Sequence, residues 1–164
     1  MSSLKPSTDV LYFASVLYQS HIEPIKLLGL EIDSELTPSY NPLLNYYSKE
    51  MGDSLKRQIF LFPKIESREL LVSKKSWAHN LEQSTLASGK RTVNIDIGYL
   101  SLEQMVLATG KPYSHRIYLG EGVYADLNYI FENKTYKKLS WTYPDYADQE
   151  KIDWFNLMRK KLIH

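Results

Sequence analysis

The chain has 164 residues, of which 43% are hydrophobic and 24% are charged, and it contains no cysteine. This length and composition are typical of one cooperatively folded domain, which buries roughly two-thirds of the surface of its unfolded chain. The lack of cysteine excludes disulfides, thiolate metal sites, iron–sulfur clusters and cysteine nucleophiles. We therefore expect residues 1–164 to form a single domain, with a flexible segment at residues 1–7.

Positive and negative charges are almost balanced, with 20 Lys and Arg against 19 Asp and Glu. Without a positive excess, the composition does not predict nucleic-acid binding. The N-terminal residues lack the apolar core of a signal peptide, and no apolar run approaches the ~20 residues of a membrane span. We therefore expect a cytoplasmic protein that binds neither nucleic acid nor membranes.

The first elements are predicted from an apolar run and a capping pattern. Residues 10–18 are continuously apolar and rich in strand-forming residues, which predicts a central strand buried on both faces. Ser20 and Glu23 have the spacing of a capping box, and Gly29 is a typical stop signal, so a short helix is expected between them. Residues 31–42 contain two prolines and are expected to be a loop.

A second strand and a long helix are predicted next. Residues 55–62 are dense in β-branched and aromatic residues, and we expect Pro63 to end this strand. Residues 67–88 form the longest helical pattern. Their middle is polar, which indicates that one face of the helix remains solvated.

The second half of the chain is predicted to be mainly strands. Residues 91–99 alternate cleanly between apolar and polar side chains, and residues 105–109 form a weaker strand. Residues 114–119 and 123–130 are expected to pair as a hairpin. A C-terminal helix over residues 148–162 begins with acidic residues and ends with basic ones, as the helix dipole favours.

The register of the hairpin is predicted from the consistency of its two faces. A three-residue loop over residues 120–122 places Leu119 opposite Val123 and Arg116 opposite Asp126, whereas a one-residue slip would mix charge into the apolar face. The predicted apolar face comprises Ile117, Leu119, Val123, Ala125 and Leu127, and the polar face comprises Arg116, Tyr118, Tyr124 and Asp126.

Established catalytic and nucleotide-binding motifs are absent from the sequence. It contains no P-loop, no dinucleotide-binding glycine pattern, no H-E-x-x-H, no G-x-S-x-G and no EF-hand loop. The four histidines, His21, His79, His115 and His164, are widely separated, so we predict no zinc site.

Polar residues on predicted strands form the most informative pattern that remains. Asn94 and Asp96 share one strand, and Arg116 and Asp126 lie on the hairpin. Charges in the middle of strands are costly when buried unless they are paired. Two interpretations stay open: a solvated sheet face with a cross-strand ion pair, or the lining of a pocket.

Four segments in order along the chain resemble a known family. They are residues 46–52 (YYSKEMG), 93–99 (VNIDIGY), 115–125 (HRIYLGEGVYA) and 141–146 (WTYPDY). The chain is identified on these segments as a member of the domain-of-unknown-function 4416 family of bacteria and archaea. The resemblance implies a single-domain prokaryotic protein, and it implies no activity, cofactor or catalytic residue.

These observations favour an α+β fold with one antiparallel or mixed sheet of five or six strands, the helices packed mainly on one face and the site on the open face. Our first hypothesis is a site for a small, polar, anionic metabolite, with Arg116 and Lys56 binding the anion. The candidate catalytic residues are Asp96, Glu50 and His115, and the other candidate ligand-binding residues are Asn94, Asp126, Tyr118, Tyr124, Trp141 and Tyr143.

The second hypothesis is a protein-interaction module without catalysis, which docks a partner through the aromatic segment from Trp141 to Tyr146. Trp, Tyr and Arg dominate the binding energy of protein interfaces. A divalent cation would be expected only if Asp96, Asp126 and Glu50 converge. The sequence identifies no cofactor.

Overall fold

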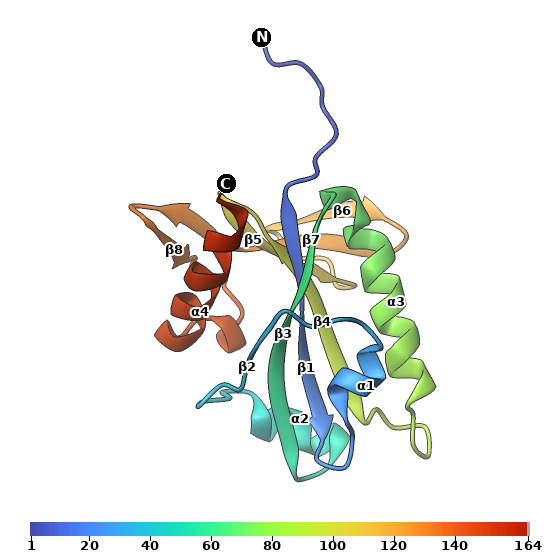
Figure 1. Ribbon diagram of the computed structural model, residues 1–164. Coiled ribbons are helices and arrows are strands. Elements are labelled where there is room, and N and C mark those ends of the chain that lie inside the picture. The colour runs from blue at the N-terminus through green and yellow to red at the C-terminus, as the bar shows by residue number, and fades with distance from the viewer. Residues whose placement is uncertain (164) are drawn as a thin grey trace.

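One antiparallel sheet organises the protein. A computed structural model describes residues 1–163 (Figure 1). It confirms the α+β class and the antiparallel sheet, but the sheet has eight strands rather than five or six, in the order β2-β3-β1-β4-β5-β7-β6, with β8 paired to β7. The strands are β1 (Val10–Gln19), β2 (Ser34–Leu36), β3 (Leu55–Glu66), β4 (Val93–Leu100), β5 (Gln104–Thr109), β6 (Arg116–Gly120), β7 (Val123–Glu132) and β8 (Thr135–Lys138).

Helices cover both faces of this sheet, so the prediction of helices mainly on one face is wrong. The long helix α3 packs with one apolar cluster of the sheet, and the C-terminal helix α4 packs with another on the opposite face (Figure 1). Within residues 1–163 no helix is both long and apolar enough to cross a membrane. The α-helices are α1 (Pro24–Leu28), α2 (Leu44–Met51), α3 (Leu71–Ser84) and α4 (Gln149–Arg159).

Strand β1 explains why both faces need a cover. Successive side chains of a strand point to opposite faces. Tyr12 and Ala14 pack in the cluster with α3, whereas Leu11 and Phe13 pack in the cluster with α4, and all four are buried. The continuous apolar run therefore predicted this central strand correctly, although it could not indicate which helix covers which face.

Several boundaries in the first half differ from prediction. The expected loop over residues 31–42 contains the edge strand β2, and α1 begins at Pro24 without a side-chain cap from the preceding residues. Strand β3 continues past Pro63, because its register with β1 shifts between Leu11 and Phe13. A proline lacks the N–H that a regular ladder requires, and such an irregularity accommodates it.

The longest helix is shorter than predicted, and a second strand, in addition to β2, was not predicted. A 3₁₀ turn (Arg68–Leu70) precedes α3, which ends at Ser84 rather than near residue 88. Strand β8 is only four residues long and lies after a tight turn at Asn133 and Lys134, both with positive φ.

The hairpin of β6 and β7 confirms most of the predicted register. Arg116 lies opposite Asp126 and Tyr118 opposite Tyr124, as expected. The tip differs, because Gly120 pairs with Val123 and a bulge falls at Leu119, so the predicted Leu119–Val123 pair is wrong. The predicted apolar face is also only partly buried, since β6 is an edge strand whose apolar side chains remain exposed.

Strands β4 and β5 pair over only part of their length. Gly98, Tyr99 and Leu100 pair with β5, and the ladder stops there, so residues 93–97 of β4 have no strand neighbour on that side. At the end of the ladder, a Cβ on Gly98 would lie 2.6 Å from the Val106 carbonyl oxygen and 2.7 Å from the Phe13 ring. The two strands come this close because position 98 has no side chain.

We expect Gly98→Ala to destabilise the fold, because the new methyl group would collide with backbone and a core ring. The expected loss is about 1–3 kcal/mol in the free energy of unfolding, measured by chemical denaturation. Gly110→Ala is the matched control, since its nearest neighbour would be 3.9 Å away, and we expect it to change stability by less than about 0.5 kcal/mol. Equal stability of the two variants would contradict this account.

Candidate functional site

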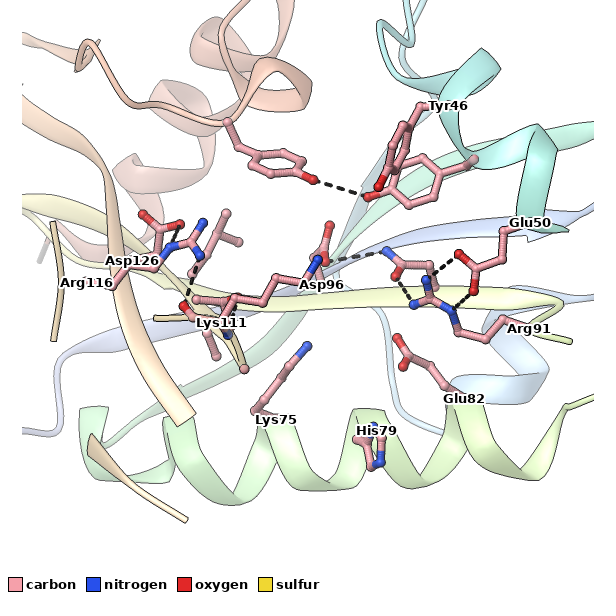
Figure 2. Close-up of a pocket in the computed structure, with 17 residues that line it drawn as sticks. Tyr46, Glu50, Lys75, His79, Glu82, Arg91, Asp96, Lys111, Arg116 and Asp126 are labelled. Atoms are coloured by element: carbon pink, nitrogen blue, oxygen red, sulfur yellow. Dashed lines mark hydrogen bonds and ion pairs between the residues drawn. The ribbon is translucent and has the colours of Figure 1, made fainter. Parts of the chain in front are cut away.

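A cavity of about 530 Å³ opens where β4 and β5 separate. Its walls come from β4 and β5, from α3 on one face of the sheet, and from α2 and the segment before α4 on the other face (Figure 2). The lining is strongly charged. Its ionisable residues other than tyrosine are Glu50, Lys75, His79, Glu82, Arg91, Asp96, Lys111, Arg116 and Asp126.

Arg91 organises one end of the cavity. Its guanidinium donates two hydrogen bonds to the Glu50 carboxylate, at 2.8 and 2.9 Å, and a third of 2.8 Å to Oδ1 of Asn94. The hydrogen bonds from Arg91 lower the pKa of Glu50. Glu50 is therefore ionised and engaged in a bidentate pair, which makes it a structural partner rather than a proton donor.

A buried arginine lies behind the floor of the cavity. Nη1 of Arg57 donates to Ser15 Oγ at 2.7 Å, and Nη2 donates to Asp145 Oδ2 at 2.9 Å. The same Nη1 is 3.9 Å from Oδ2 of Asp96, whose side chain is 25% exposed towards the cavity. Burial raises the pKa of Asp145, and the charge of Arg57 opposes that effect. The Arg57 guanidinium thus places a positive charge near Asp96 from outside the lining of the cavity.

Asp126 is held by a histidine and an arginine at the opposite end. His115 Nε2 lies 3.0 Å from one carboxylate oxygen, and Arg116 Nε donates to the other at 3.1 Å. Arg116 also donates to the Lys111 carbonyl at 2.9 Å, which ties the turn after β5 to β6. His115 itself stacks on Trp141, with ring centroids 5.0 Å apart.

Helix α3 presents three polar residues to the cavity. Lys75, His79 and Glu82 are four and three residues apart, so they lie along one stripe of the helix. Glu82 Oε1 accepts the Ile95 N–H at 2.7 Å, which satisfies a backbone group of β4 that β5 does not reach. Burial raises the pKa of this carboxyl group, which is only 6% exposed.

Two ammonium groups of the cavity lack a carboxylate partner. Within residues 1–163, neither Lys75 nor Lys111 forms an ion pair, whereas Arg91 and Arg116 both do. Figure 2 shows the side chain of Lys75 rising from α3 and that of Lys111 entering from the turn after β5. Lys75 and Lys111 are therefore the Lys and Arg side chains of the lining that no ion pair holds within residues 1–163.

The predicted site residues divide into two groups. The cavity brings together Asn94, Asp96, Glu50, Arg116, Asp126 and Tyr143. The others lie outside its lining: His115 and Trp141 stack behind Asp126, and Tyr118 and Tyr124 pack against each other towards the hairpin tip.

Lys56 is also outside the lining of the cavity. It is exposed on β3, whereas the adjacent Arg57 points to the other face and is 2% exposed. Alternation along a strand accounts for this placement, because neighbouring residues face opposite sides of the sheet. A choice between two adjacent cations needed the strand register, which the sequence did not provide.

Other site residues were not predicted. Lys75, His79 and Glu82 lie in the polar middle of the predicted helix, which was interpreted as a solvated face. Arg91 and Lys111 lie in connections at the ends of strands, where single charged residues give no pattern.

The three carboxylates considered for a divalent cation do not converge. Asp126 is engaged by His115 and Arg116, and Glu50 by Arg91. In the part of the chain that the structure describes, no group of three or more His, Asp or Glu residues lies close enough to bind a metal ion.

The pKa of Glu82 leads to a prediction about pH. A raised pKa means that the folded state binds this proton more tightly than the unfolded chain, so its contribution to stability is present below about pH 4.5 and is lost as the pH rises through the folded-state pKa. As the pH rises from 4.5 to 7, we expect the free energy of unfolding of Glu82→Gln to increase relative to that of wild type. Gln does not ionise, and it still offers an oxygen to the Ile95 N–H.

Denaturation curves at several pH values measure this difference. The exposed substitution Glu31→Gln, outside the cavity, serves as the control and is expected to leave the pH dependence of wild type unchanged. A Glu82→Gln difference that is flat or falls with pH would show that burial does not govern this group.

Comparison with known proteins identifies a family. Residues 9–162 match the family model described as Domain of unknown function (DUF4416). No curated protein and no solved structure matches the chain.

Proposed function

The chain belongs to the DUF4416 family, and we propose that the cavity between β4 and β5 binds a small anionic metabolite. The observation that supports this most directly is the pair of ammonium groups on Lys75 and Lys111, which share one cavity without a carboxylate partner in residues 1–163. A bound anion would supply these two ammonium groups with the negative partner that the ion pairs of the fold do not give them.

The cavity has the size and polarity of a metabolite site. A volume of about 530 Å³ lies within the 300–1,000 Å³ that is typical of small-molecule sites. Tyr47 and Tyr143 contribute hydroxyl groups 3.4 Å apart at one wall. Burial raises the pKa of both, so they remain protonated and can donate hydrogen bonds to an anion at neutral pH.

The side chains of the proposed site support ligand binding rather than a particular reaction. Glu50 is engaged by Arg91, and His115 lies outside the lining with its Nε2 at Asp126. Among the candidate catalytic residues, Asp96 is the one that lines the cavity without a bidentate partner in residues 1–163. It contributes a hydrogen-bond acceptor to the proposed site.

The interaction-module hypothesis receives less support from the structure. In the aromatic segment from Trp141 to Tyr146, Asp145 and Tyr146 are buried, and the Trp141 indole N–H donates to the Leu127 carbonyl at 2.7 Å. These groups are used within the fold. Asp96, Arg116 and Asp126 line one concave cavity, which is the arrangement that favours a small-molecule site over a flat docking face.

We expect Lys75→Gln and Lys111→Gln each to weaken anion binding by about 10- to 100-fold, because a hydrogen bond to a charged partner contributes about 1.5–3 kcal/mol. Thermal shifts with phosphate, sulfate and dicarboxylates at constant ionic strength provide the measurement. Lys56→Gln is the matched control, since it removes the same charge from an exposed position outside the cavity, and we expect it to bind like wild type.

The proposal fails if no anion stabilises the wild type. It also fails if Lys56→Gln weakens binding as much as Lys75→Gln and Lys111→Gln, because binding would then follow the net charge of the protein and not the cavity.

A further inference from the structure

We propose that the ligand of this cavity is a phosphate monoester of a sugar or another polyol, with the phosphate between Lys75 and Lys111 and hydroxyl groups at Asp96 and Glu82. The inference rests on the proposed function, and it specifies which anion the site selects. It follows from the charge of the cations, the length of the cavity and the chemistry of its carboxylates.

The cations favour phosphate over a single carboxylate. Lys75 on α3 and Lys111 after β5 enter the cavity from different walls, and each lacks a carboxylate partner within residues 1–163. A phosphate monoester has about −1.5 to −2 charges at neutral pH and three acceptor oxygens, so it can compensate two ammonium groups at once. A monocarboxylate would leave one of them uncompensated.

The length of the cavity lining requires a ligand in which a further chemical group is attached to the phosphate. Lys75 and Glu82 are seven residues apart on α3, which corresponds to about 10 Å along the helix axis at ~1.5 Å per residue. Figure 2 shows both side chains directed from α3 into the cavity. A ligand that contacts both must therefore extend well beyond one phosphate group.

Two carboxylates of the lining, Asp96 and Glu82, are suited to hydroxyl groups. Glu82 Oε1 accepts a backbone N–H, and the closest cation to Asp96 is Arg57 at 3.9 Å. An ionised carboxylate only accepts hydrogen bonds, so a second anionic group would be repelled and an apolar group would leave these oxygens unsatisfied. Hydroxyl groups donate to such oxygens, and a polyol offers several on a short body.

An amine could also pair with these carboxylates, but Glu82 argues against it. Its carboxylate is bonded by a neutral amide and is buried, which favours the uncharged form of the group. A neutral carboxyl group attracts an ammonium group weakly, whereas it forms hydrogen bonds with hydroxyl groups in either protonation state.

Calorimetric titration of the purified chain with five probes tests the inference. The probes are glucose 6-phosphate, glycerol 3-phosphate, phosphoethanolamine, inorganic phosphate and glucose. We expect the two polyol phosphates to bind at least about 10-fold more tightly than inorganic phosphate and phosphoethanolamine, since one extra charge-assisted hydrogen bond is worth about that factor. Glucose without phosphate should bind weakest.

Substitutions of the lysine and of the carboxylates separate their contributions to ligand affinity. Lys75→Gln should weaken every phosphate probe, whereas Glu82→Gln and Asp96→Asn should weaken only the polyol phosphates, by about five-fold, because each amide replaces one acceptor oxygen of the carboxyl group with an NH2 group that only donates. Glu82→Gln retains an oxygen for the Ile95 amide, so it remains informative if Asp96→Asn disturbs the buried Arg57. Lys56→Gln is again the control.

Each outcome has a distinct meaning. If inorganic phosphate binds as tightly as the polyol phosphates, or if phosphoethanolamine binds more tightly than both, the polyol inference is wrong and the anion site remains. If dicarboxylates or sulfate stabilise the protein and no phosphate compound binds, the inference is wrong in the same way. If no anion of any kind binds, the proposed function is wrong as well.

Discussion

The partial separation of β4 and β5 is the constraint on which the cavity depends. A strand that loses its neighbour within a sheet exposes backbone N–H and C=O groups that must find other partners. Glu82 supplies one of these partners to Ile95 from helix α3, which itself packs on the sheet through a separate apolar cluster. The helix therefore stabilises the opening and lines it at the same time, so the fold and the site share one structural element.

A network around a buried arginine lies in the same region. Arg57 connects Ser15 and Asp145 across the sheet and lies behind Asp96. Removing one partner of such a buried pair is costly, since an uncompensated charge remains. Because several strands fix this network, the positive charge of Arg57 stays close to Asp96, whose carboxylate also accepts a long hydrogen bond of 3.5 Å from the Asn94 amide.

The sequence predicted the elements whose patterns are local. The apolar run of β1, the alternation in β4 and the pairing of Arg116 with Asp126 each follow from side-chain periodicity over a few residues. Contacts between elements that are far apart in the sequence could not be predicted in this way. Helix α4 packs opposite α3, and Arg57 rather than Lys56 points to the face that carries Asp96. Both facts depend on which side of the sheet an element or side chain covers.

The cavity also lies within the sheet, and this position has a mechanical consequence. One wall belongs to β4 and α3, and the other belongs to β5 and the turn that Arg116 ties to β6. The ladder between β4 and β5 ends near Gly98, so beyond it these two strands are not paired with each other. In the proposed mode of binding, an anion held by Lys75 on one wall and Lys111 on the other would bridge this gap with charge-assisted hydrogen bonds. The same contacts would then bind the ligand and stiffen the sheet.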